Sequence, residues 1–175
     1  MEFLSLIKSY VPDYAKDIRL NVDSTIARSS LDASDAVGVA LAAAFAAKNQ
    51  TLIKAFKEAG VLSPEEVQGA MTAASLMGMN NVWYPFVEMA DDEDLKTQGA
   101  QLRMNAYANN GGLDKRRFEM YALAASIIGK CHFCVKSHFD LLKKEGMSAT
   151  QLRDVGRIVA VVNALAQVLT AENIV

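Results

Sequence analysis

The chain has 175 residues, of which 51% are hydrophobic and 22% are charged, and its formal net charge at pH 7 is -2. These values are typical of one globular domain with its own core, and they exclude a disordered chain. Because no excess of basic residues is available to neutralise a phosphate backbone, a nucleic-acid partner is not expected.

The apolar segments of the sequence also argue against secretion and membrane insertion. Residues 1–8 lack the basic start, the long apolar stretch and the small-residue cleavage site of a secretory signal. The longest apolar run, residues 36–47, is much shorter than the roughly 20 residues that span a bilayer. We therefore expect a cytoplasmic protein that does not associate with a membrane.

Helical periodicity runs along the first half of the chain, without a sustained strand pattern. Pro12 ends the first expected helix, and Gly60 gives the fourth a left-handed stop. Asp32 or Ser34 is placed to cap the third, which is rich in alanine. These four expected helices cover about residues 3–10, 13–25, 34–48 and 51–59.

A capping box marks the start of the longest expected helix. Ser63 is placed as the N-cap, Pro64 at the first helical position and Glu66 at the third. We expect this helix to extend to about Met89. Within it, the aromatic segment 83–86 is either the wall of a substrate pocket or the point where proline interrupts the helix. Four methionines at roughly helical spacing are expected to be core or subunit contacts: Met71, Met77, Met79 and Met89.

The second half of the chain contains three further helical segments. Asp114 is placed to cap the first, the second begins near Cys131 and stops at Gly146, and a capping box opens the third. In that box, Ser148 is the N-cap and Gln151 follows at the third helical position. The expected helices cover about residues 114–128, 131–145 and 148–170.

The two halves present these signals in the same order. An alanine-rich helix, a shorter helix, a glycine stop and a capping box occur in about residues 34–90 and again in about residues 114–171. At the positions of the two cysteines, the first unit has Asn49 and Leu52. We predict an all-α fold, a single compact helical domain over residues 1–175 built from a duplicated unit. The alternative is that two alanine-rich hairpins are alike by composition alone.

Residues 129–138 contain both cysteines and both histidines of the chain. A helix that begins near Cys131 places Cys131, Cys134 and His138 on one face, because they stand at positions i, i+3 and i+7. The N-terminus of a helix favours a thiolate, and His138 can accept the proton of Cys134. In a reducing cytosol a lone Cys-x-x-Cys is typically redox-active or metal-binding.

Glu119 is the candidate to orient His138. It stands twelve residues before Cys131 among apolar neighbours, where an unpaired carboxylate is costly. A turn after the preceding helix would let it face the histidine directly or through a water. The alternative is a solvated carboxylate near a helix start that pairs with Lys115 or Arg116.

Two alternatives to redox chemistry use the same residues. A structural zinc site would take Cys131, Cys134 and His138 together with His132 or Glu119 as ligands. These cysteines and histidines crowd into eight residues, however, and no second ligand pair follows at the spacing of a zinc finger. The other alternative is a pair of inert cysteines buried on a core helix.

The order Glu119, Cys131-x-x-Cys134, His138 resembles the signature of the alkyl hydroperoxide reductase D family, within the carboxymuconolactone decarboxylase-like superfamily. Further segments similar to that family lie at residues 14–21, 77–82 and 102–105. The resemblance implies an all-helical homotrimer that reduces organic hydroperoxides through a cysteine pair, without a bound cofactor. It also implies a partner peroxiredoxin of the alkyl hydroperoxide reductase C type, and electrons from dihydrolipoyl groups of a lipoyl-carrying protein.

By position, the resemblance implies a role for each residue of the motif. Cys134 matches the nucleophile that passes through a sulfenic acid, and Cys131 matches the proton donor that then closes the disulfide. His138 and Glu119 match the proton-relay pair. Reduction of that disulfide needs an external dithiol, so we expect both sulfurs to be reachable.

One position departs from the family pattern. Members that match the signature most closely carry histidine immediately before the second cysteine, whereas this chain has Phe133 there and a histidine at His132. His132 lies about 100° around the helix from Cys131, so it need not replace the missing group. The role of His132 is therefore left open, and a shorter proton relay is one consequence.

Decarboxylation of a muconolactone-type acid is the remaining alternative, on the same superfamily fold. That chemistry has no need of a vicinal thiol pair. An activity that survives Cys131→Ser would therefore favour it.

Overall fold

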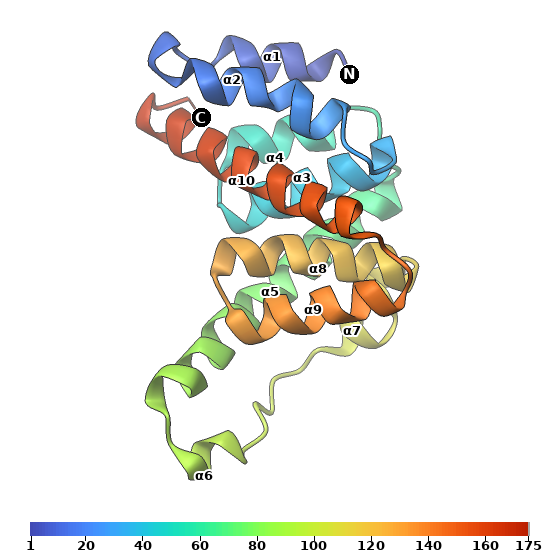
Figure 1. The fold of residues 1–175 in the computed structure, drawn as a ribbon, viewed down its shortest axis with the longest axis vertical. Helices are drawn as coiled ribbons and strands as arrows, with labels where there is room; N and C mark the ends of the chain where they lie inside the picture. The colour runs from blue at the N-terminus through green and yellow to red at the C-terminus, as the bar shows by residue number, and fades with distance from the viewer. Residues whose placement is uncertain (175) are drawn as a thin grey trace.

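The computed structural model of the protein describes residues 1–174, and within that range every regular element is a helix (Figure 1). The α-helices are α1 (Phe3–Ser9), α2 (Lys16–Val22), α3 (Ala33–Ala46), α4 (Gln50–Lys57), α5 (Pro64–Ala90), α6 (Glu93–Lys96), α7 (Asn105–Ala108), α8 (Lys115–Gly129), α9 (His132–Lys144) and α10 (Ala149–Ala171). Short turns of 3-10 or π helix cover Asp13–Ala15, Asp23–Ala27 and Asn110–Gly112. The predicted all-α fold is thus confirmed.

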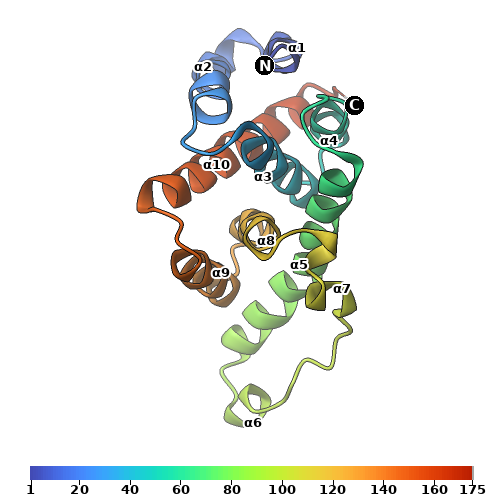
Figure 2. The same ribbon diagram turned by 90° about the vertical axis from the view of Figure 1, so that its right-hand side faces the viewer.

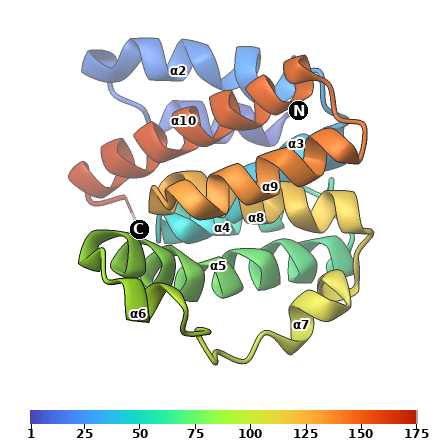
Figure 3. The same cartoon turned by 60° about the horizontal axis from the view of Figure 1, so that its bottom comes forward.

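Helix α8 lies at the centre of the molecule. Figure 2 shows it end-on, with α3, α5, α9 and α10 around it, and every residue from Phe118 to Ser126 is buried. Helix α3 approaches it closely because Gly38 has no side chain, and a Cβ there would overlap the ring of Tyr121. Helix α9 runs alongside α8 (Figure 3). The elements that carry the cysteines and Glu119 are therefore packed against each other.

The end of α5 projects from this helical body together with α6 (Figure 1). The alternative that the helix is interrupted before Pro85 is wrong, because α5 continues through Pro85 to Ala90. Proline lacks an N–H and leaves one backbone carbonyl without its helical partner. This part of α5 is partly exposed, with the side chains of Val82, Phe86 and Met89 on its surface.

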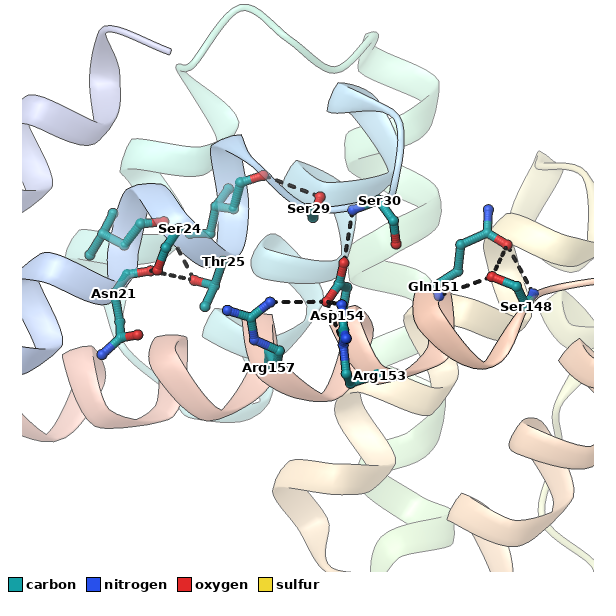
Figure 4. A network of polar contacts seen from close by, with 12 residues as sticks. Asn21, Ser24, Thr25, Ser29, Ser30, Ser148, Gln151, Arg153, Asp154 and Arg157 are labelled. Atoms are coloured by element: carbon teal, nitrogen blue, oxygen red, sulfur yellow. Dashed lines mark hydrogen bonds and ion pairs between the residues drawn. The ribbon is translucent and has the colours of Figure 1, made fainter.

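Both predicted capping boxes are confirmed. Ser63 Oγ accepts a hydrogen bond from the N–H of Glu66 at 3.2 Å, and the Glu66 carboxylate accepts one from the N–H of Ser63 at 2.8 Å. Ser148 and Gln151 exchange the same two bonds at the start of α10 (Figure 4). Before that box, Gly146 has φ +89°, the left-handed conformation that ends a helix. These local sequence signals determine where α5 and α10 begin.

The two halves of the chain also begin their shorter helices in the same way. The side chain of Asn49 caps α4 by accepting from the N–H of Leu52 at 3.0 Å. Cys131 caps α9 by accepting from the N–H of Cys134 at 3.2 Å. The duplication stays a prediction, and this matched pair of caps supports it.

Helix α10 is the one helix of residues 1–174 that is long and apolar enough to cross a membrane. Its most apolar 18-residue window has a mean hydropathy of 1.3, and half of that window is buried inside the protein. The helix packs against α3 and α8. A core helix of this kind passes the same test of length and composition.

Asp154 is a buried carboxylate on α10 that tethers the segment before α3 (Figure 4). The N–H of Ser30 donates to it at 2.8 Å, and the guanidinium groups of Arg153 and Arg157 donate at 3.0 and 3.2 Å. Burial alone raises the pKa of Asp154, but the hydrogen bonds from Ser30 and the two arginines outweigh it. The pKa of Asp154 falls to about 2 as a result.

Replacing this carboxylate is expected to weaken the fold in a pH-dependent way. A shift from 3.8 to about 2 corresponds to roughly 2 kcal/mol, so Asp154→Asn should lose about that much unfolding free energy at pH 7. Because the folded-state pKa is lowered, the contribution is present above about pH 4 and is lost as the pH falls through about 2. Urea unfolding of both proteins at pH 7 and pH 2 measures this, and an equal difference at the two pH values would contradict it.

Candidate active site

Helix α9 begins at the cysteine pair. Lys130, rather than Gly129, adopts the left-handed conformation (φ +53°) that turns the chain out of α8, and Cys131 then serves as the N-cap of α9. The Sγ atoms of Cys131 and Cys134 lie 2.15 Å apart, so the structure contains the disulfide form of the pair. The sequence prediction that a helix starts at Cys131 is confirmed.

The two sulfurs differ in how they can be approached. Cys131 is fully buried and Cys134 is 3% exposed, so the expectation that both are reachable is wrong for this form. The N-cap position turns Cys131 inward toward α5, where its sulfur lies 4.0 Å from the carbonyl oxygen of Asn80. Of the two, Cys134 lines a pocket of about 460 Å³. The other residues around this pocket are Asn80, Tyr84, Met104, Tyr107, Ala108, Phe133, Ser137 and His138. A reagent that enters it meets Cys134 first.

Glu119 and His138 form a buried pair beside this pocket. Nδ1 of His138 lies 2.5 Å from Oε2 of Glu119, and both side chains are almost fully buried. The hydroxyl of Tyr107 donates to the other carboxylate oxygen at 2.6 Å. The alternative of a solvated Glu119 is wrong, because its suggested partners bond elsewhere: Arg116 pairs with Asp35 and Lys115 pairs with Glu145.

These contacts decide the charge on Glu119. Burial raises the pKa of its carboxyl, but the hydrogen bonds from His138 and Tyr107 outweigh burial and hold the pKa below its ordinary value. Burial and the hydrogen bond to Glu119 raise the pKa of Tyr107. The carboxylate is therefore ionised at neutral pH and accepts from both neighbours, since the tyrosine keeps its proton.

The second ring nitrogen of His138 has a partner that the sequence did not suggest. Nε2 lies 3.2 Å from Sδ of Met77 on α5. The sequence predicted Cys134 as the partner of His138, and the two residues do line the same pocket, one helical turn apart. In the disulfide form the sulfur of Cys134 is bonded to Cys131 and has no thiol proton to give. Nε2 of His138 contacts Met77 instead.

His132 lies apart from this group. Its side chain is 81% exposed, and Nδ1 lies 3.0 Å from Oε1 of Glu88. It lines a second pocket of about 460 Å³, together with Trp83 and Tyr84 from the aromatic segment of α5. Phe133 stacks on Tyr84 with 4.2 Å between ring centroids and borders both pockets. The structure therefore does not bring His132 to Glu119 and His138.

The zinc alternative has no support in the part of the chain that the structure describes. Within residues 1–174, no three or more side chains of histidine, cysteine, aspartate or glutamate gather closely enough to hold a metal ion. His132 points to Glu88, while Cys131 and Cys134 bond to each other.

Two members of the site were missed at the sequence level. Tyr107 comes from the short helix α7, and Met77 was expected only as a core or subunit contact. No local pattern around Tyr107 indicates its role. Met77 opens one of the segments that resemble the family, residues 77–82, which was the only available signal for it.

Comparisons with known proteins identify relatives of this chain. The profile of the carboxymuconolactone decarboxylase family matches residues 93–175. Three similar proteins carry the name alkyl hydroperoxide reductase AhpD. The protein of Coxiella burnetii strain RSA 493 / Nine Mile phase I is 41% identical over 175 residues, covering 97% of this chain and 98% of its own length. Those of Maricaulis maris and Rhodospirillum centenum are 42% and 40% identical, covering 97% of this chain and 99% and 91% of their own lengths.

Proposed function

The chain belongs to the alkyl hydroperoxide reductase AhpD family, and on that basis we propose that it is an antioxidant thiol peroxidase that reduces organic hydroperoxides. The observation that carries the proposal is a cysteine pair at bonding distance, one sulfur of which lines the same pocket as His138. In this proposal Cys134 is the nucleophile and Cys131 the resolving thiol. His138 and Glu119 form the proton relay.

The oxidative half-reaction begins with the reduced pair. His138 takes the proton of Cys134, and the thiolate attacks the terminal peroxide oxygen, which breaks the O–O bond. The alkoxide takes the proton of Cys131 and leaves as an alcohol. The Cys131 thiolate then displaces hydroxide from the Cys134 sulfenic acid. The hydroxide takes a proton from solvent and leaves as water, so His138 keeps the proton that it took from Cys134. Two thiols and one hydroperoxide thus yield a disulfide, an alcohol and water.

The reductive half-reaction follows from the different burial of the sulfurs. A thiolate of an external dithiol attacks Cys134, which lines the pocket, and Cys131 leaves. The N–H of Cys134, 3.2 Å from the Cys131 sulfur at the start of α9, stabilises that leaving thiolate. The second thiol of the reductant loses its proton to solvent and closes the reductant's own disulfide, which frees Cys134. Cys134 takes a proton from His138, and the Cys131 thiolate takes one from solvent.

The reductant and the partner protein are assigned from the family resemblance. We assign the reductant as a dihydrolipoyl group of a lipoyl-carrying protein. The oxidised partner that the reduced pair regenerates is assigned as a peroxiredoxin of the alkyl hydroperoxide reductase C type. A cytoplasmic location would keep such reductants available. His132, exposed beside the second pocket, has no place in this relay.

A homotrimer is the assembly that the resemblance implies. The projecting end of α5 exposes the apolar side chains of Val82, Phe86 and Met89, which suit a contact between subunits. This observation supports burial of that surface in an oligomer and does not by itself select three subunits.

Thiol titration tests the proposed function. Reduced protein should show two free thiols per chain, both should disappear after treatment with one equivalent of cumene hydroperoxide, and dihydrolipoamide should restore them. The titration is done in denaturant because both sulfurs are buried. If peroxide causes no reversible loss of two thiols, the redox function is wrong. Turnover of a muconolactone-type acid that survives Cys131→Ser would instead favour the decarboxylase.

A further inference from the structure

The thioether of Met77 occupies a position that packing alone does not explain. Its sulfur lies 3.2 Å from Nε2 of His138, closer than two neighbouring atoms without a hydrogen bond normally approach. Met77 is fully buried on α5, while His138 comes from α9. The side-chain amide of Asn80 approaches the same sulfur at 4.0 Å. The two helices therefore meet in a specific polar contact at this point.

The partners of the two ring nitrogens decide which protons the ring carries. Nδ1 lies 2.5 Å from the ionised carboxylate of Glu119, so it must donate. A thioether has no proton and accepts only. An unprotonated Nε2 would therefore set its lone pair against those of Met77, whereas a protonated Nε2 donates to the sulfur. This geometry favours a proton on each ring nitrogen of His138, with the ring paired to Glu119.

We infer that Met77 is a positioning residue that keeps a proton on Nε2 of His138 while the Cys131–Cys134 disulfide is closed. The inference rests on the proposed function, since it assigns the use of that proton to the reductive half-reaction. When the reductant's second thiol breaks the mixed disulfide, Cys134 leaves as a thiolate. The proton then passes from Nε2 to that sulfur, which lines the same pocket one helical turn away.

The weakness of a thioether as an acceptor suits this role. A carboxylate in the place of Met77 would hold the proton strongly, whereas sulfur accepts weakly and gives it up at small cost. After the transfer His138 is neutral, and Nε2 is free to accept the proton of Cys134 when the next hydroperoxide arrives. Met77 thus holds the ring of His138 in place between the two half-reactions.

Nitrogen-15 NMR of the oxidised protein at pH 7 tests the first part of the inference. The chain has two histidines, so a His132→Gln variant assigns the signals of His138. In wild type we expect the signature of a doubly protonated ring. In Met77→Leu, which keeps the volume but removes the acceptor, we expect a neutral ring. Met77→Gln supplies an oxygen acceptor and should restore the doubly protonated form.

The rate of disulfide reduction by dihydrolipoamide tests the second part. Met77→Leu should reduce this rate about tenfold, a part of what a general acid contributes, and Met77→Gln should recover most of it. The matched control is Met147→Leu, which changes another buried methionine that is not a partner of His138. This control should match wild type in both measurements.

Several results would overturn the inference. A neutral His138 in oxidised wild type, or a doubly protonated ring in Met77→Leu, removes its basis. If dihydrolipoamide reduces the disulfide of Met77→Gln as slowly as that of Met77→Leu, Met77 acts by packing only. A different result would overturn the proposed function, namely that wild type forms no disulfide when it is treated with peroxide. The NMR comparison still decides the role of Met77 in that case.

Discussion

Cys131→Ser is expected to consume one equivalent of hydroperoxide per chain and then to turn over about a hundredfold more slowly than wild type. Cys134 can still attack the peroxide, but its sulfenic acid no longer has a thiol beside it. Residual turnover then depends on attack of the external reductant on the sulfenic acid, and this bimolecular step is slower than attack by a thiol held beside it. Peroxide consumption with dihydrolipoamide as reductant measures the effect.

Trapping identifies the intermediate in this variant. Dimedone, which reacts with sulfenic acids, should label Cys134 in Cys131→Ser after peroxide treatment, and peptide mass spectrometry locates the label. The matched control is Cys134→Ser. It should not consume even the first equivalent of hydroperoxide, and Cys131 should carry no dimedone label. Full multiple turnover by Cys131→Ser would contradict the role assigned to Cys131.

Glu119→Gln should weaken both the activity and the fold. The buried imidazole of His138 loses the carboxylate 2.5 Å from Nδ1, and Tyr107 loses an ionised acceptor. We expect peroxide turnover to fall about a hundredfold and the unfolding free energy at pH 7 to fall by about 3 kcal/mol, as when a buried ion pair is broken. Turnover assays and urea unfolding at pH 7 measure the two effects.

The stability effect should also depend on pH. Because the folded-state pKa of Glu119 is lowered from 4.5, its contribution is present above that pH and is lost as the pH falls through the lowered value. The unfolding free energies of wild type and Glu119→Gln should therefore converge at acidic pH. The control is Glu145→Gln, which breaks an exposed pair with Lys115 and should cost less than about 1 kcal/mol. A gap that stays constant from pH 7 to pH 3 would show that the charge of Glu119 is not what stabilises the pair.

The sequence predicted the helices well where their ends are encoded locally. Ser63 and Ser148 begin α5 and α10, and Cys131 begins α9, because an N-cap bonds to residues only two or three positions away. Pro85 is the contrasting case, because the local sequence leaves open whether the helix continues through it. Whether a proline breaks a helix depends on what surrounds the freed carbonyl, and that surrounding is set by tertiary structure.

The site was predicted only where its residues share one segment or the family signature. The helical face of Cys131, Cys134 and His138 follows from spacing alone, and Glu119 came from its apolar surroundings. Tyr107 and Met77 reach the site from α7 and α5, so they depend on how distant helices pack. The burial of Cys131 depends in the same way on α5. Periodicity carries no information about such contacts.

The most direct test of the proposed peroxidase reaction is the stoichiometry of a single oxidation of reduced wild type. One equivalent of cumene hydroperoxide is added, the alcohol is quantified by chromatography, and peptide mass spectrometry determines the state of both cysteines. We expect one molecule of alcohol for each Cys131–Cys134 disulfide that forms. Alcohol formed while both thiols remain free, or peroxide left unreacted beside a fully reduced pair, would contradict it.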